Sequence, residues 1–182
     1  MARIEPLTAD ELDARGIDPA PFLAHFDELP GSVTTLAYRP EILRGTLALW
    51  DAVMKEGEVP LPLKYMVGYL ASMAAGCRYC SAHTASNAAA SGASTDQIEA
   101  LWDYETSPLF TKAERAALHF ARLAGLSPSG VEDADMDRLK EHYDAGQIVE
   151  LLAVIALYGF FNRWNDSLAT PLEATPRGFA GA

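Results

Sequence analysis

The chain is poor in several residue types that define whole classes of protein. Lys and Arg together number 14 against 25 Asp and Glu, which gives a net charge of −11 at pH 7. Such a surface repels phosphate backbones and anionic lipids, so neither nucleic acid nor a membrane is an expected partner. Cysteine occurs only twice, and no basic region followed by an apolar core marks the N-terminus. The sequence therefore predicts a cytoplasmic protein without a framework of structural disulfides.

Long apolar runs and alternating segments are also scarce. The longest run, IVELLAVIALYGFF at 148–161, carries Glu150 and is shorter than the ~20 residues that a membrane helix needs. No segment alternates apolar and polar residues as a half-buried strand does. Three pairs instead fit the capping box that begins a helix: Thr8 with Glu11, Ser94 with Gln97, and Thr111 with Glu114. Since 49% of the residues are apolar and 21% are charged, a single all-α domain over 1–182 is expected.

Helical periodicity predicts about eight or nine helices. The predicted segments are 8–15, 19–28, 41–56, 61–75, 77–91, 95–103, 111–124, 133–143 and 145–168. The tail 170–182 is rich in Pro, Gly and Ala and is expected to be loosely ordered. The segment 145–168 is apolar around much of its surface. It is therefore expected either at the centre of a bundle or in an interface between identical subunits.

Both cysteines stand in the stretch GCRYCSAHT, residues 76–84. On a helix, Cys77 and Cys80 lie one turn apart on one face, and His83 lies one further turn along. The first turn of a helix stabilises a thiolate. His83 is placed to accept the proton of Cys80 or to stabilise its thiolate. We therefore expect at least one thiol with a pKa below the ordinary value.

Three other interpretations compete with a redox dithiol. Buried cysteines often serve as small apolar residues. A zinc site needs four ligands, or three and a water, and Cys77, Cys80 and His83 supply three with no second pair to complete a structural site. A thioredoxin-like motif follows a strand in a βαβ unit, and no such unit is predicted. The spacing favours the dithiol, with no metal or organic cofactor expected.

The segment LPLKYMVGYLASMAAGCRYCSAHTASNAAASG, residues 61–92, resembles the core motif of the carboxymuconolactone decarboxylase / alkylhydroperoxidase D-like family. The shared order is a proline-led helix, the pattern GCxYC, a histidine one turn on, and a small-residue helix that ends in glycine. The resemblance implies an alkylhydroperoxidase D-like helical bundle that assembles into homo-oligomers. It also implies peroxide reduction, in which Cys80 attacks the peroxide and Cys77 resolves the sulfenic acid to a disulfide. An external dithiol reductant then restores the thiols.

Some positions depart from the family pattern. Redox members usually carry a glutamate twelve residues before the first cysteine, where this chain has Tyr65, preceded by Lys64. Their histidine usually lies four residues after the second cysteine, where this chain has Thr84, so His83 comes one residue early. Tyr65 is expected to offer a hydrogen bond rather than act as a base, because an ordinary phenol has a pKa of ~10. The alternatives are lactone decarboxylation, although decarboxylase members lack the dithiol, and a redox sensor without turnover.

The stretch FFNRWND, residues 160–166, places polar side chains in the apolar C-terminal helix. The simplest interpretation is a helix end that emerges into solvent, with an Arg163–Asp166 pair. The functional alternative places Asn162 or Trp164 in the wall of a pocket near the dithiol.

Overall fold

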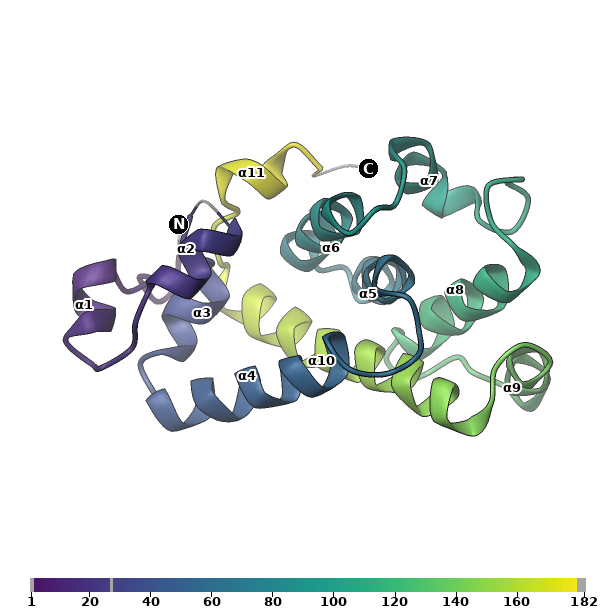
Figure 1. Cartoon of the computed structure of the whole chain (residues 1–182), viewed down its shortest axis with the longest axis horizontal. Coiled ribbons are helices and arrows are strands. Elements are labelled where there is room, and N and C mark those ends of the chain that lie inside the picture. The colour runs from purple at the N-terminus through teal and green to yellow at the C-terminus, as the bar shows by residue number, and fades with distance from the viewer. Residues whose placement is uncertain (1, 27, 180–182) are drawn as a thin grey trace.

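The structure is a computed structural model that describes residues 2–26 and 28–179 (Figure 1). Within these residues the fold is all-α, with eleven α-helices, one short 3-10 helix and no strand. The predicted fold class is confirmed, although eight or nine helices were expected. The helices are α1 (Ala9–Asp13), α2 (Ala20–Phe26), α3 (Gly31–Leu36), α4 (Pro40–Met54), α5 (Leu61–Ala74), α6 (Arg78–Ala90), α7 (Thr95–Glu99), η1 (Ala100–Asp103), α8 (Lys112–Ala124), α9 (Asp133–Lys140), α10 (Ala145–Leu168) and α11 (Ala174–Arg177).

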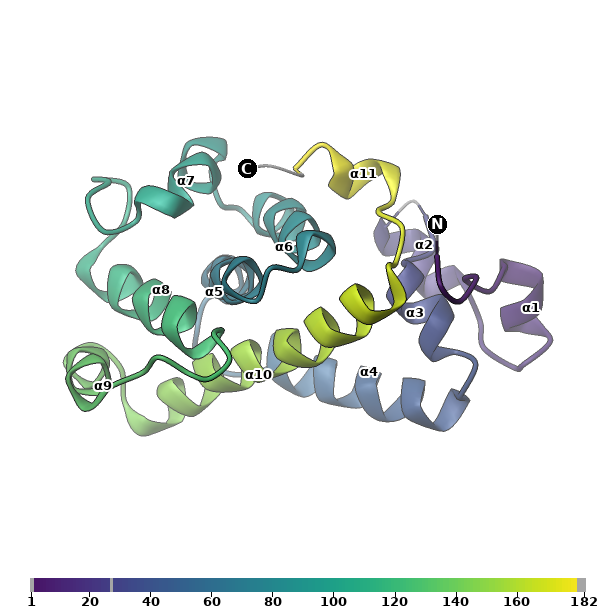
Figure 2. The ribbon, with the colours of Figure 1, turned by 180° about the vertical axis from the view of Figure 1, so that it is seen from behind.

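Helices α5 and α6 form the centre of the bundle (Figure 1). They pack extensively on each other, and α5 also packs on α8 and α10. The long helix α10 crosses beneath this pair, with α4 alongside it. The view from behind shows the chain turning back after α10, so that α11 lies against α6 (Figure 2). Helices from both ends of the chain therefore surround the segment that carries the two cysteines.

A glycine turn joins α5 to α6 and sets the position of the cysteines. Gly76 has a φ of 78°, in the left-handed region that favours glycine. Its N–H donates to the carbonyl of Met73, and the N–H of Cys77 donates to the carbonyl of Ser72, both at 3.0 Å. These two bonds are the Schellman pattern that ends a helix. Cys77 is then the N-cap of α6, and Cys80 lies in its first turn.

The structure differs from the sequence prediction near both ends of the chain. Helix α3 was not predicted; it starts after Pro30 without a side-chain cap. The tail was expected to be loosely ordered from residue 170, but it contains α11 and packs against α6. Residues 180–182 of that predicted tail lie outside the described residues. The segment 95–103 divides into α7 and η1, because the last turn tightens to 3-10 geometry.

Helix α10 is both a core element and a partly exposed one. It begins at a capping box of Asp144 and Gln147 and packs on α3, α4, α5, α6, α8 and α9. By length and composition alone it could cross a membrane, since it has 24 residues and a mean hydropathy of 1.5. A third of its apolar window, 33%, is buried in the fold. Its inner face packs against the centre of the bundle, while large apolar residues remain on its outer face.

Candidate active site

The two cysteine sulfurs are buried at the start of α6. Cys77 is 2% exposed and Cys80 is 3% exposed, and both are free thiols. Ser81 donates a hydrogen bond of 2.6 Å to the carbonyl of Cys77, and Thr84 donates one of 2.8 Å to the carbonyl of Cys80. Thr84, one of the predicted supporting residues, therefore braces the backbone of the dithiol turn. Both sulfurs are held within a packed helix rather than on a mobile loop.

The pKa values of the two thiols are shifted in opposite directions. The thiol of Cys80 donates a hydrogen bond to the sulfur of Cys77, and this lowers the pKa of Cys77 despite its burial. The backbone N–H groups of Cys80 and Tyr79 also favour the Cys77 thiolate. Burial and the hydrogen bond to Cys77 raise the pKa of Cys80 well above its ordinary value. The expected low-pKa thiol is therefore Cys77, and Cys80 is the thiol that holds its proton more strongly.

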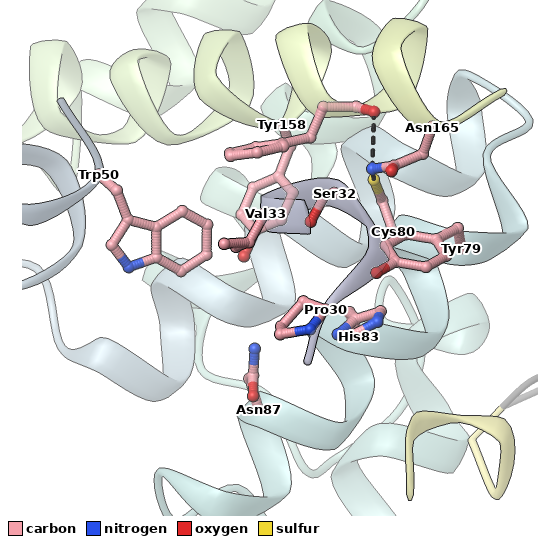
Figure 3. A pocket seen from close by; sticks show the side chains of 11 residues that line it. Pro30, Ser32, Val33, Trp50, Tyr79, Cys80, His83, Asn87, Tyr158 and Asn165 are labelled. Atoms are coloured by element: carbon pink, nitrogen blue, oxygen red, sulfur yellow. Dashed lines mark hydrogen bonds between the residues drawn. The ribbon is translucent and has the colours of Figure 1, made fainter. Parts of the chain in front are cut away.

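A small cavity of about 80 Å³ opens onto Cys80 (Figure 3). The 11 side chains that line it come from α3, α4, α6 and α10 and from the loop before α3, and they include Cys80 but not Cys77. Most of the wall is apolar or aromatic. The lining residues are Pro30, Ser32, Val33, Trp50, Tyr79, Cys80, His83, Asn87, Tyr158, Phe161 and Asn165.

Asn165 is the described residue of α10 that hydrogen-bonds to the dithiol. Its side-chain N–H₂ donates to the carbonyl of Phe161 at 3.0 Å and to the sulfur of Cys80 at 3.5 Å. Its Oδ1 atom is buried, with no hydrogen-bond partner among the described residues. Unpaired buried acceptors are rare because each costs about 1–3 kcal/mol. An acceptor of this kind beside the Cys80 sulfur suits a ligand that carries a hydrogen-bond donor.

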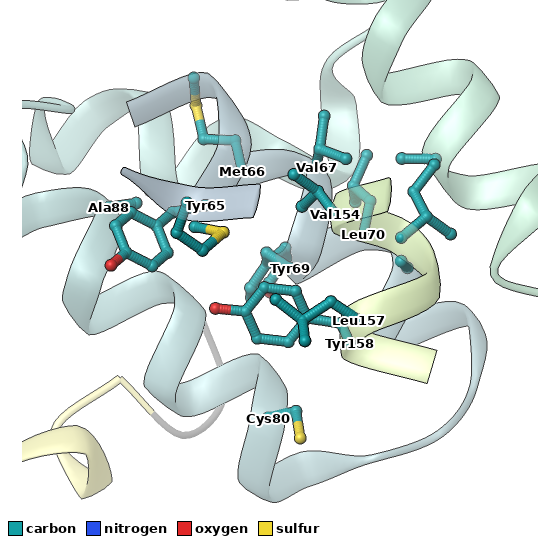
Figure 4. Packing of buried hydrophobic residues seen from close by; sticks show 14 of the residues in the cluster. Tyr65, Met66, Val67, Tyr69, Leu70, Cys80, Ala88, Val154, Leu157 and Tyr158 are labelled. Atoms are coloured by element: carbon teal, nitrogen blue, oxygen red, sulfur yellow. The ribbon is translucent and has the colours of Figure 1, made fainter. Parts of the chain in front are cut away.

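Tyr158 supplies a second polar group of this kind. Its hydroxyl oxygen is buried and, like Asn165 Oδ1, lacks a partner within the described part of the chain. Burial raises the pKa of Tyr158 well above its ordinary value, so the hydroxyl stays protonated and can donate. A Cβ at Gly68 of α5 would lie 2.5 Å from the Tyr158 ring, so only glycine allows this close packing. Figure 4 shows Tyr158 within the apolar cluster between α5 and α6.

His83 and Tyr79 form the wall on the opposite side of the cavity from Trp50 (Figure 3). Their rings lie 4.4 Å apart between centroids. Nε2 of His83 is 2.7 Å from Oε2 of Glu173, and the hydroxyl of Tyr79 donates to Oε1 of Glu173 at 2.7 Å. The predicted His83 is therefore at the cavity, and the hydrogen bond described for it runs to a carboxylate of the C-terminal tail.

The other predicted residues have different surroundings. Lys64 is buried and forms an ion pair of 2.6 Å with Glu150, which ties α5 to α10. Tyr65 is buried in the apolar cluster, and burial raises its pKa. Asn162 is buried and lines a different hollow, and Trp164 donates to Thr35 at 2.9 Å. None of these four residues is among the side chains that line the Cys80 cavity.

Sequence reasoning missed Asn165, Tyr158 and Glu173. Asn165 lies in the polar stretch FFNRWND, but a helix that is apolar nearly all round does not reveal which asparagine faces the cysteines. Tyr158 looks like one more core residue of that helix. Glu173 lies in a Pro-rich tail, and no local pattern marks it. Within the described residues no three His, Cys, Asp or Glu side chains form a group that could hold a metal ion.

The all-helical bundle has an alkylhydroperoxidase D-like fold, and it carries a buried Cys-x-x-Cys pair. Residues 40–123 match the sequence model of the carboxymuconolactone decarboxylase family. The matched segment contains α4, α5 and α6 and therefore the whole dithiol turn. The resemblance noted for 61–92 is confirmed.

Similar proteins include both curated sequences and solved structures. The uncharacterized protein YnjA of Escherichia coli (strain K12) is 36% identical over 101 residues, which cover 56% of each chain, so the match spans little more than half of that relative. The debrominase Bmp8 has a TM-score of 0.87 at 28% identity, covering 95% of this chain and 93% of the other. A cysteine-to-alanine variant of Bmp8, solved in complex with 2,3,4-tribromopyrrole, has a TM-score of 0.85 at 28% identity. That match covers 95% of this chain and 92% of the variant.

A third solved structure supports the fold at lower identity. An uncharacterized peroxidase-related protein of Ralstonia eutropha, described as an alkylhydroperoxidase core, has a TM-score of 0.81 at 20% identity. The match covers 96% of this chain and 94% of that one. At this identity the likeness concerns the fold alone.

Proposed function

We propose that the protein is a thiol-dependent peroxidase in which Cys80 attacks the peroxide and Cys77 resolves the product. The observation that carries the proposal is the contrast between the two sulfurs. Cys80 lines the cavity, whereas Cys77 is outside the cavity wall and has the lowered pKa. The hydrogen bond between them is a direct path for the Cys80 proton.

The reaction balances with the groups at the site. Cys80 passes its proton to the Cys77 thiolate, and the Cys80 sulfur attacks one peroxide oxygen, so an S–O bond forms as the O–O bond breaks. The departing alkoxide takes the proton from Cys77 and leaves as an alcohol. The Cys77 thiolate then attacks the sulfur of the Cys80 sulfenic acid, and an S–S bond forms as hydroxide leaves with one proton from solvent. An external dithiol reduces the disulfide by thiol–disulfide exchange.

Asn165 and Tyr158 suit the head group of a hydroperoxide. A hydroperoxide has one O–H donor and two acceptor oxygens. Oδ1 of Asn165 accepts from that O–H, and the Tyr158 hydroxyl donates to the oxygen that leaves. Both atoms lack a partner among the described residues, so each gains a hydrogen bond when the substrate binds. The apolar wall around Trp50 and Phe161 favours an organic hydroperoxide.

The proposal is tested with purified protein, tert-butyl hydroperoxide and dithiothreitol as the reductant. We expect steady turnover that Cys80→Ser abolishes. Cys77→Ser should react once and stop at a sulfenic acid, which dimedone traps on Cys80. A sulfenic acid on Cys77 in the Cys80→Ser variant would reverse the roles of the two cysteines. A disulfide that forms once without steady turnover would indicate a redox sensor instead.

A second candidate is reductive dehalogenation, which the aromatic wall of the cavity favours together with the similarity to Bmp8. In that reaction a thiolate takes the halogen from carbon, the carbanion takes a proton, and the second thiolate displaces halide as the disulfide forms. Bromide release from 2,3,4-tribromopyrrole with dithiothreitol tests it. Bromide release faster than hydroperoxide turnover would favour this candidate. Lactone decarboxylation, the further alternative that the family suggests, predicts an activity that survives replacement of both cysteines.

A further inference from the structure

One buried carboxylate gathers three hydrogen-bond donors beside the Cys80 cavity. Oε1 of Glu173 accepts from the N–H of Gly31 at 2.6 Å and from the hydroxyl of Tyr79 at 2.7 Å. Oε2 lies 2.7 Å from Nε2 of His83. The Glu173 side chain is only 11% exposed. These donors come from the start of α3 and from α6, while the carboxylate comes from the loop between α10 and α11.

This arrangement keeps Glu173 ionised. Burial alone raises the pKa of a carboxyl, but here the hydrogen bonds from His83, Gly31 and Tyr79 outweigh burial and lower the pKa of Glu173. An ionised carboxylate only accepts hydrogen bonds. Nε2 of His83 must therefore carry a proton, and in the neutral ring Nδ1 is the basic nitrogen.

Two of the three donors are also part of the cavity wall. His83 and Tyr79 both line the cavity that opens onto Cys80, and their ring planes are tilted by 34° to each other. A single carboxylate thus fixes the rotation of the imidazole, its tautomer and the position of the neighbouring phenol. The third bond, to Gly31, fixes the carboxylate itself against α3.

The path of the chain brings Glu173 to this place. Ala169 ends α10 with a φ of 49°, and the chain then turns back toward α6. The N–H of Ala174 donates to Oε2 of Glu28 at 3.2 Å, and α11 packs on α6 (Figure 2). Two neighbouring residues therefore hold this part of the tail. Ala174 hydrogen-bonds to Glu28, and Glu173 hydrogen-bonds to side chains of the cavity wall.

We propose that Glu173 is a positioning residue that holds His83 in its Nε2–H tautomer and fixes the imidazole ring in the wall of the Cys80 cavity. The effect on catalysis rests on the proposed function, whereas the effect on the His83 tautomer does not. The amide of Glu173→Gln has one donor end and one acceptor end, so it cannot accept from all three donors. The shorter Glu173→Asp keeps the charge and should restore part of the effect.

The experiment compares Glu173→Gln and Glu173→Asp with Glu28→Gln, which removes the carboxylate that accepts from the N–H of Ala174 in the tail. ¹⁵N–¹H NMR of the imidazoles reports the tautomer, with the His83 signals assigned by their loss in His83→Asn. We expect an Nε2–H tautomer in the wild type and in Glu28→Gln, and a mixture in Glu173→Gln. With tert-butyl hydroperoxide, Glu173→Gln should lower kcat about tenfold or more and alter its pH profile, with KM little changed.

Each outcome decides a separate point. An unchanged His83 tautomer in Glu173→Gln overturns the proposal. An altered tautomer with wild-type kcat and pH profile overturns its catalytic part. Equal losses in Glu28→Gln and Glu173→Gln mean that docking of the tail matters rather than the contact with His83. A wild type without peroxide turnover overturns the proposed function, and the tautomer comparison still decides whether Glu173 positions His83.

Discussion

At the scale of single residues, the proton of Cys80 determines how the dithiol reacts. The Cys80 thiol hydrogen-bonds to Cys77 and lowers the pKa of Cys77, while the pKa of Cys80 is raised. We predict that thiolate absorbance at 240 nm shows one group ionising below the ordinary value near 8.5 and one above it. Cys80→Ala removes the donor and should raise the pKa of Cys77. The first-turnover rate should rise with pH through the first ionisation, because that ionisation creates the shared thiolate.

The same titration in Cys77→Ala separates the two sulfurs. In this variant the remaining Cys80 thiol should ionise above the ordinary value, because burial raises its pKa. The backbone N–H groups that lower the pKa of Cys77 do not lower the pKa of Cys80. A low pKa that remains in Cys77→Ala and disappears in Cys80→Ala would contradict the assignment.

The unpaired hydroxyl of Tyr158 gives a second prediction. Tyr158→Phe removes a buried group that has no partner in the described residues, so it should leave the free energy of unfolding unchanged or raise it by up to about 1 kcal/mol. Peroxide turnover should fall, because the leaving oxygen loses its donor. The measurements are chemical denaturation and steady-state kinetics.

Tyr104→Phe is the matched control. The Tyr104 hydroxyl bonds to Glu105 at 2.8 Å and accepts from Arg122 at 3.3 Å, away from the cavity. The same loss of a hydroxyl should therefore cost about 1 kcal/mol of stability and leave turnover unchanged. If Tyr158→Phe costs as much stability as Tyr104→Phe, the Tyr158 hydroxyl is paired and its assigned role is wrong.

At the scale of elements, the turn between α5 and α6 holds the dithiol in register. Gly76→Ala forces a Cβ into the left-handed region, and we predict a loss of about 1–2 kcal/mol of unfolding free energy. Gly45→Ala, in the interior of α4 with nothing within 4 Å of the new Cβ, should instead stabilise by roughly 0.5–1 kcal/mol. Chemical denaturation compares the two variants. If both substitutions changed the free energy of unfolding equally, the positive φ at position 76 would not require a glycine.

The helices also show which features of the fold can be predicted from the sequence. The capping boxes at Thr8, Ser94 and Thr111 are confirmed, because caps depend only on neighbouring residues. Helix α3 was missed because it has no side-chain cap and contains the β-branched run Val33–Thr35. Local spacing alone was enough to locate Cys77, Cys80 and His83.

The rest of the site depends on tertiary packing. Whether Asn162 or Asn165 meets Cys80 depends on the rotation of α10, which an almost uniformly apolar helix does not encode in its pattern. Lys64 is adjacent to Tyr65 in the sequence, yet it pairs with Glu150 from α10. Glu173 reaches His83 only because the chain reverses after α10, and no feature of the local sequence reports that reversal.

At the scale of the whole molecule, one apolar surface remains uncovered. We call it the α4–α10 face; it consists of Ile42, Leu49, Val149, Leu152 and Phe160, whose exposed fractions range from 39% for Phe160 to 67% for Val149. Ile42, Leu49 and Phe160 line one shallow groove between the two helices. The chain carries a net charge of −11, so an apolar patch of this size stands out on an acidic surface.

We propose that a second copy of the chain covers the α4–α10 face, because most soluble oligomers are symmetric and bury the same apolar patch on each subunit. Phe160→Glu places a charge at the edge of the groove between α4 and α10, and burying an unpaired charge is costly. We therefore predict a wild-type homo-oligomer that Phe160→Glu converts to monomers, measured by light scattering after size-exclusion chromatography. Trp102→Glu, which changes another exposed aromatic residue on η1, should leave the mass unchanged. A wild-type monomer at micromolar concentration, or equal masses for Phe160→Glu and wild type, would contradict an interface on this face.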